Sequence, residues 1–217
     1  MPESVHTPYA GRWLTPTTPR LEPLAPAELS RRDRLVLAVI RKRTRSGFDF
    51  TVFRTLARLR GVFGVHAALV GQLLRPGHLN ADEKELVILR SAWRLGCIYE
   101  WAHHSHIADE LGVEPDRRAA VTSDPVRGLD PRLTAMLQAA DVLIAERRLD
   151  DDAWTAASRV LTGDEILELC FLVGHYAMVA MTINSVGVQL EEPFLPYATP
   201  YPGPGTAESD AGSEVTR

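Results

Sequence analysis

The sequence has few cysteines, no excess of basic residues and no long apolar run, and each shortage argues against one class of protein. Its 217 residues include two cysteines, Cys97 and Cys170, too few for a disulfide framework. Lys and Arg number 24 against 28 Asp and Glu, so the net charge of -4 gives no field to hold a nucleic-acid backbone. The apolar run from Leu169 to Ile183 spans about 15 residues, short of the roughly 20 that cross a membrane. We therefore expect neither nucleic acid nor a membrane as a partner.

The first residues, MPESVHTPYAGRW, lack the apolar core of a secretory signal. Together with the scarcity of cysteine, this predicts a reducing, cytoplasmic location. The fractions of 45% apolar and 24% charged residues are typical of a globular protein. A chain of this length suits one domain.

Proline is scarce in the middle of the chain, where only four of the fifteen lie. Six fall in residues 1–26 and five in residues 193–204. Because proline cannot continue a helix, we expect an N-terminal arm over 1–25, one helical domain over 26–192 and a Pro-rich, partly disordered tail over 193–217. Phe194 and Tyr197 make the start of this tail aromatic enough to lie on a surface, such as that of a neighbouring subunit, although a floppy tail remains an equal alternative.

The sequence also has no convincing alternating β pattern, whereas helical periodicity recurs along the whole domain. The fold class it predicts is therefore all-α. Asn80 with Glu83 and Thr162 with Glu165 form two capping boxes, and Gly112 suits a helix end. The expected helices cover about 27–45, 49–74 (kinked or split by glycines), 81–95, 97–111, 131–148, a short one from 150 or 151, and 163–185.

Several ionisable residues fall on the apolar faces of these helices. Glu85 lies within the arc of its helix that Ile88 and Leu89 define. Four residues apart, Glu100 and His104 share an inward stripe with other core positions. A buried carboxylate is unfavourable unless something pairs with it, so a carboxylate and an imidazole one turn apart either satisfy each other structurally or transfer protons.

Two further observations favour the second interpretation. Glu85 adds another buried carboxylate on the preceding helix, and His175 lies among apolar residues of the last helix. Burying several ionisable groups reduces the stability of the fold, which favours a functional role for them.

The residues that carry this pattern have a known counterpart. The segment from Glu85 to Gly112 resembles the carboxymuconolactone decarboxylase family, whose other branch contains the AhpD-like alkyl hydroperoxide reductases. In that redox branch a glutamate precedes a Cys-x-x-Cys pair by twelve residues, and a histidine follows the second cysteine by four. Glu85, Cys97 and His104 match these positions, but Glu100 replaces the second cysteine.

The form Tyr99-Glu100-Trp101, followed by His104, is similar to the non-redox, decarboxylase-like branch. The resemblance extends over about residues 50–192, including LNADEKELVILR and the helix LELCFLVGHYAMVAMTINSVGVQLEE. It implies an AhpD-like helical bundle that forms a homo-oligomer, a dimer, trimer or hexamer, with the motif helices lining a pocket.

The activity that the resemblance implies is a lyase-like, cofactor-independent acid/base reaction on a small carboxylated lactone or enoate. His104 would donate or relay the proton, Glu100 would orient it and Glu85 would serve as a second carboxylate. The residues expected to shape the pocket or bind the substrate are Cys97, Tyr99, Trp101, His103 and His175. No cofactor and no metal are expected.

Three alternatives remain. A thiol peroxidase or disulfide reductase needs a resolving thiol, and Cys170 could supply one only by packing against Cys97. A di-iron protein needs a second copy of the Glu100-x-x-His103 motif, which the sequence lacks. A non-catalytic oligomeric protein could use the same pocket to capture a ligand, although such a protein has no need of buried charges. Arg90 could hold a substrate carboxylate, but its wheel position favours solvent or an interface.

Overall fold

A computed structural model describes residues 13–199, and within this range it contains helices and no strand. The all-α fold predicted from the sequence is therefore confirmed. Nine α-helices are followed by one 3-10 helix: α1 Arg31–Thr44, α2 Thr51–Leu56, α3 Phe63–Leu73, α4 Ala81–Arg94, α5 Ile98–Glu110, α6 Pro115–Ala120, α7 Pro131–Glu146, α8 Asp151–Ser158, α9 Gly163–Val186 and η1 Glu192–Tyr197. Disorder expected over 203–217 lies outside the described residues.

The helix starts follow the capping signals of the sequence. Both expected capping boxes are present, with the Asn80 and Thr162 side chains accepting from the backbone at Glu83 and Glu165. The first helix begins at residue 31 and not at 27, because Ser30 is its N-cap and accepts from the backbone N–H of Asp33. The expected interruption of 49–74 is real, since α2 and α3 are separate helices.

Two short elements were not expected, and both have a proline in their first turn. Pro115 opens α6 and Pro193 lies in the first turn of η1. Proline is well tolerated in a first turn, so it marks the start of these elements and not an absence of structure. Because η1 packs on α5 and buries Phe194, residues 193–199 are part of the packed body, although the sequence assigned them to the tail.

The described part of the N-terminal arm also packs on the body. Trp13 lies edge-on to Trp93 with ring centroids 5.8 Å apart, and the Thr15 hydroxyl donates to Asn184 Oδ1 at 2.8 Å. Gly187 ends α9 with φ of 74°, and a Cβ there would meet the Thr18 carbonyl oxygen at 2.9 Å. Glycine is therefore required both for the left-handed turn and for the close approach of the arm.

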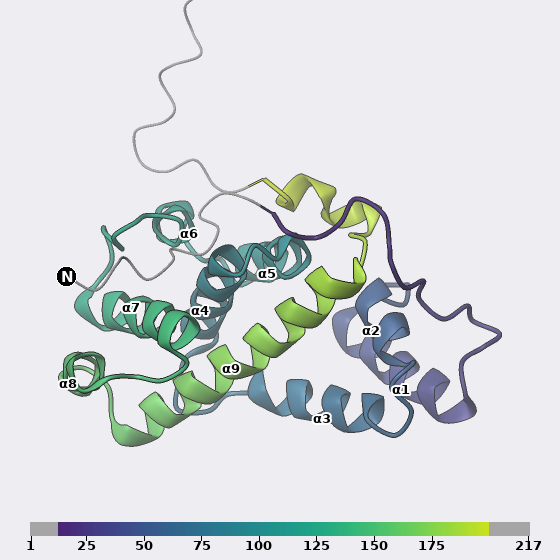
Figure 1. The fold of residues 1–217 in the computed structure, drawn as a ribbon, viewed down its shortest axis with the longest axis horizontal. Helices are drawn as coiled ribbons and strands as arrows, with labels where there is room; N and C mark the ends of the chain where they lie inside the picture. The colour runs from purple at the N-terminus through teal and green to yellow at the C-terminus, as the bar shows by residue number, and fades with distance from the viewer. Residues whose placement is uncertain (1–12, 200–217) are drawn as a thin grey trace, which may run out of the picture.

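The longest helix, α9, runs diagonally through the molecule, with α4, α5 and α7 on one side and α1, α2 and α3 on the other (Figure 1). Two hydrophobic clusters result. The first half of α9 packs with α4 and α7, whereas its second half packs with residues of α2 and with the start of α5. Because α5 and α9 contribute to both clusters, they bring the two halves of the body together.

By length and composition α9 could span a membrane, with 24 residues and a mean hydropathy of 1.8 in its most apolar window. The sequence count of about 15 residues was too short, because the helix continues past Glu168 at one end and Asn184 at the other. Of that window, 44% is buried inside the protein, against α4 and α7. One such helix is weak evidence for a membrane span, because the core helix of a globular protein passes the same test.

Candidate active site

A cavity of about 900 Å³ lies between two walls of the helical body. The helices α1 and α3 pack against each other and form one wall, while α5 and the second half of α9 form the opposite wall. Residues around the start of α2 close one side. The volume is near the top of the roughly 300–1,000 Å³ range of pockets that enclose small ligands. The lining is mostly apolar, and its polar side chains come from α5 and α9 and also from α1, α3 and Arg75, just beyond the end of α3.

His104 lies in the second turn of α5 and lines this cavity, and Glu85 of α4 binds its ring. Its Nδ1 lies 2.6 Å from Glu85 Oε2, and the two side chains are 10% and 6% exposed. A carboxylate can only accept here, so Nδ1 carries the proton and Nε2 is left for the cavity. The sequence predicted that Glu85 and His104 would both point inward, but it paired His104 with Glu100 and not with Glu85.

Glu100 also lies at the cavity wall but has a different environment. It is buried, and neither carboxylate oxygen has a nitrogen or oxygen hydrogen-bond partner among the described residues. Burial raises the pKa of Glu100 well above its usual range, and the neighbouring Cys97 thiol offsets this only in part. Burial therefore favours the protonated form of Glu100, which can donate a hydrogen bond or a proton.

Three rings of α3 and α9 continue the polar part of the lining. Tyr176 lies edge-on to His104 with centroids 4.9 Å apart and edge-on to His175 at 5.4 Å. His175 stacks on His66 of α3 at 5.2 Å and 20°. Burial, followed by the charge of His66, lowers the pKa of His175 to about 4, and burial lowers that of His66. Both imidazoles are therefore neutral at pH 7.

Tyr99 and His103 belong to a second cluster, centred on a residue that the sequence did not single out. Glu191, just beyond α9, accepts from the Tyr99 hydroxyl at 2.7 Å and lies 2.8 Å from His103 Nε2. It also accepts from the backbone N–H of Thr51, at the start of α2. His103 is further covered by Phe194, with centroids 3.8 Å apart. Glu191 thus ties α2, α5 and the C-terminal segment together behind the cavity.

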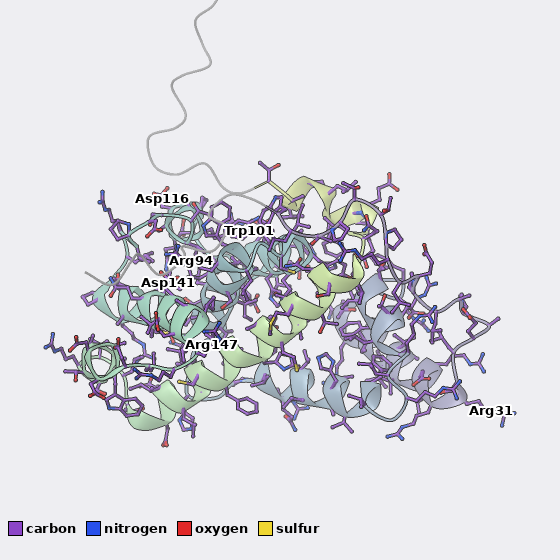
Figure 2. All side chains as sticks on the ribbon, in the orientation of Figure 1. Arg31, Arg94, Trp101, Asp116, Asp141 and Arg147 are labelled. Carbon is purple, nitrogen blue, oxygen red and sulfur yellow. The ribbon has the colours of Figure 1, made fainter. Side chains whose placement is uncertain are left out.

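Not all expected site residues reach the cavity. Tyr99, Glu100, His103, His104 and His175 line it, but Cys97 and Trp101 do not. Trp101 is fully buried on the other side of α5, where it packs against Trp93 and Trp13 (Figure 2). The sequence correctly predicted that Trp101 is buried. Because α5 is buried on two sides, its helical wheel does not show which side faces a cavity.

Arg90 is fully buried, contrary to its expected position at solvent or an interface. Its guanidinium makes a bidentate contact with Asp141 of α7, at 2.8 and 2.7 Å. Arg94 binds the same carboxylate at 2.7 and 2.8 Å. Arg94 and Asp141 are labelled next to each other in Figure 2. The pair joins α4 to α7, away from the cavity, and therefore has a structural role.

The cavity thus brings together an oriented imidazole and a carboxyl group whose protonated form is favoured by burial. His104 Nε2 can take a proton from a carbon atom, while Glu100 and the Tyr176 hydroxyl can donate to an oxygen that becomes negative. Environments that push the titration of neighbouring groups apart are typical of acid/base sites. Within residues 13–199, no cluster of three or more His, Cys, Asp or Glu side chains is placed to hold a metal ion.

Comparison with known proteins agrees with this description. The model of the carboxymuconolactone decarboxylase family matches residues 62–142, which include the whole of α4 and α5. No curated protein matches the chain.

Solved structures resemble the chain in fold at low sequence identity. The alkylhydroperoxidase AhpD core protein of Ralstonia eutropha JMP134, described as an uncharacterized peroxidase-related protein, has a TM-score of 0.71 and 19% identity, covering 84% of this chain and 97% of its own. A variant of the debrominase Bmp8 in complex with 2,3,4-tribromopyrrole has a TM-score of 0.69 and 16% identity, covering 83% and 96%. An uncharacterized peroxidase-related protein of Silicibacter sp. TM1040 has a TM-score of 0.68 and 16% identity, covering 88% and 97%.

The family match falls on the helices that carry Glu85, Glu100 and His104. The structural matches extend over most of the described body. The resemblance predicted from the sequence is therefore confirmed: residues 62–142 match the carboxymuconolactone decarboxylase family, and the protein has an AhpD-like helical fold.

Proposed function

We propose that the protein is an enzyme that moves protons at carbon, without a cofactor, on a carboxylated lactone or enoate. The observation that carries this proposal is the 2.6 Å contact between His104 Nδ1 and Glu85 at the wall of a cavity that also contains Glu100. A carboxylate behind an imidazole fixes its tautomer and stabilises the imidazolium that forms when it takes a proton.

In the proton-transfer form of this reaction, His104 Nε2 removes a proton from a carbon next to a conjugated carbonyl. The electron pair moves into the carbonyl, whose oxygen becomes negative and receives a hydrogen bond from Glu100. The imidazolium then returns the proton to carbon. In the decarboxylating, lyase form, the bond to the carboxyl carbon breaks, carbon dioxide leaves, and the electron pair moves into the conjugated carbonyl. Here His104 starts as an imidazolium that has taken its proton from water, gives this proton to the dienolate carbon, and is protonated again by water.

The test is exchange of carbon-bound protons with deuterated water, followed by NMR on a panel of carboxylated lactones and enoic acids. We expect exchange with the parent protein and a loss of about 10²- to 10⁴-fold in His104→Gln. Glu83→Gln is the matched control, because it changes a buried carboxylate of α4 that binds Arg132 and does not line the cavity. Equal exchange rates in the parent and His104→Gln would contradict the proposal.

One observation favours a second candidate, a non-catalytic protein that captures a ligand. The cavity lining is mostly apolar, which suits binding without any reaction. Such a protein would bind lactones or enoic acids of the panel without exchanging their carbon-bound protons.

The thiol-redox alternative has less support. Burial, and next the charge of Glu100, raise the pKa of the Cys97 thiol well above its usual value, which disfavours the thiolate that attack requires. Cys170 packs in the other hydrophobic cluster, and both thiols are free. Free thiols also agree with the cytoplasmic location that we propose.

A further inference from the structure

The cavity is much larger than the small lactone or enoate that the sequence predicts. Such a molecule has about a dozen non-hydrogen atoms, each occupying at most the roughly 30 Å³ of a water molecule in the liquid. It would fill well under half of the volume of about 900 Å³. The remaining space lies between apolar walls, where water has few partners, so it has room for a ligand with an apolar extension.

The wall formed by α1 and α3 shows what that extension is made of. Leu35 and Val39 of α1 line the cavity and are 67% and 49% exposed, although both are large apolar side chains. Each would lose unfavourable contact with water if an apolar chain lay against it. Apolar residues of α3 and α9 continue the same surface inward: Ala67, Val70, Leu74, Val179 and Ile183.

The two histidines that α3 and α9 contribute to the lining, His66 and His175, carry no charge to attract an ion. His66 and His175 stack on each other, and neither ring nitrogen of His66 has a hydrogen-bond partner among the described residues. Both rings are neutral, as argued above. This part of the cavity accepts an uncharged chain.

Permanent positive charge is found only where α1 and α3 end. Arg43 and Arg75 are the two arginines of the cavity lining, and both are exposed. Within residues 13–199 neither forms an ion pair, whereas Arg41 of the same turn binds Asp49 at 2.5 Å. A Cβ added at Gly71 would lie 3.2 Å from Arg43 Nη1, so the guanidinium reaches across α3 beside the cavity.

We propose that the ligand of this cavity is a carboxylic acid with an extended apolar body, whose carboxylate pairs with Arg43 and Arg75. Its far end lies beside His104 and carries the carbonyl that reacts there. Only the reacting end rests on the proposed function. The apolar body and the carboxylate follow from the lining of the cavity.

The experiment uses straight-chain saturated acids of six to sixteen carbons, below their micelle concentrations, in isothermal titration calorimetry. Each further buried methylene should tighten binding roughly fourfold until the cavity is full. Alcohols of the same lengths should bind severalfold more weakly, because exposed ion pairs add little each.

Three variants assign this binding to the cavity. In Arg43→Gln combined with Arg75→Gln, the acids should lose roughly tenfold in affinity and the alcohols little. Arg31→Gln is the matched control, an exposed arginine of the same helix outside the cavity and at the edge of the molecule in Figure 2. Ala67→Phe narrows the cavity, so long acids should lose more affinity than hexanoic acid.

Affinity that does not rise with chain length would overturn the inference, as would an equal loss in Arg31→Gln and the double variant. The outcomes distinguish a failure of this inference from a failure of the proposed function. Chain-length-dependent binding without proton exchange on any acid supports the inference and rejects the enzyme. Exchange on short lactones without a chain-length effect rejects the inference and leaves the enzyme standing.

Discussion

Replacing Glu85 by glutamine tests the pair on which the proposed chemistry depends. The amide oxygen of glutamine can still accept from His104 Nδ1, so the contact and the tautomer stay while the charge is lost. A buried hydrogen bond to a charged group contributes about 1.5–3 kcal/mol, against about 0.5–1.5 kcal/mol for a neutral one. Glu85→Gln should therefore reduce the free energy of unfolding by about 1 kcal/mol.

The effect on proton transfer should be much larger than the effect on stability. Without the anion, the imidazolium that forms during the reaction loses its stabilising charge in a site where both side chains are at most 10% exposed. We expect turnover to fall about 10²- to 10⁴-fold, equivalent to roughly 3–5 kcal/mol of transition-state stabilisation. This difference between the two magnitudes distinguishes a catalytic pair from a structural one.

The assays are urea unfolding and deuterium exchange into lactone and enoic acids, measured on the same preparations. Glu83→Gln is the matched control, because Glu83 lies on α4 but binds Arg132 at 2.7 Å and does not line the cavity. It should lose stability and keep its exchange rate. Nitrogen NMR of His104 should show the proton on Nδ1 in both the parent and Glu85→Gln. A Glu85→Gln protein that is destabilised but exchanges at the parent rate would refute the reasoning.

Four further predictions concern the rest of the molecule. Asp141→Asn takes the shared carboxylate from Arg90 and Arg94, so urea unfolding should show a loss of about 3–5 kcal/mol; a loss below 1 kcal/mol would contradict the structural role of this cluster. Because the pKa of His175 falls from 6.5 to about 4 on folding, the unfolded chain binds the additional proton. The contribution of His175 to stability should therefore be constant above pH 6.5 and decrease towards pH 4, and it is measured as the difference between the thermal melts of the parent and His175→Phe across this range. Cys97→Ser should keep any native activity, and diamide followed by mass spectrometry should find no Cys97–Cys170 link in the parent. We propose that a second copy covers the exposed apolar side chains of α9, Leu167, Phe171, Met178 and Met181, so light scattering at micromolar concentration should find an oligomer and Phe171→Glu should lower its mass.

The sequence alone determined the helical fold and most helix limits, because capping and periodicity are local. The Asn80 and Thr162 caps act within one turn, and both are found where the pattern predicts them. It also identified the helices that carry the candidate site, since the spacing from Glu85 to His104 is a property of the chain itself. The short elements at Pro115 and Pro193 were missed because proline is common both in the first turn of a helix and in segments without a helix, so its presence alone does not distinguish the two.

Only the tertiary structure decided which of these residues meet. The spacing of one turn favoured Glu100 as the partner of His104, but the angle between α4 and α5 gives that place to Glu85 and leaves Glu100 buried beside Cys97. Contacts with Glu191 and His66 join residues far apart in the chain, and no local pattern encodes them. The size of the cavity depends on how far α1 and α3 stand from α5 and α9, which is a result of packing across the whole body and not of any one helix.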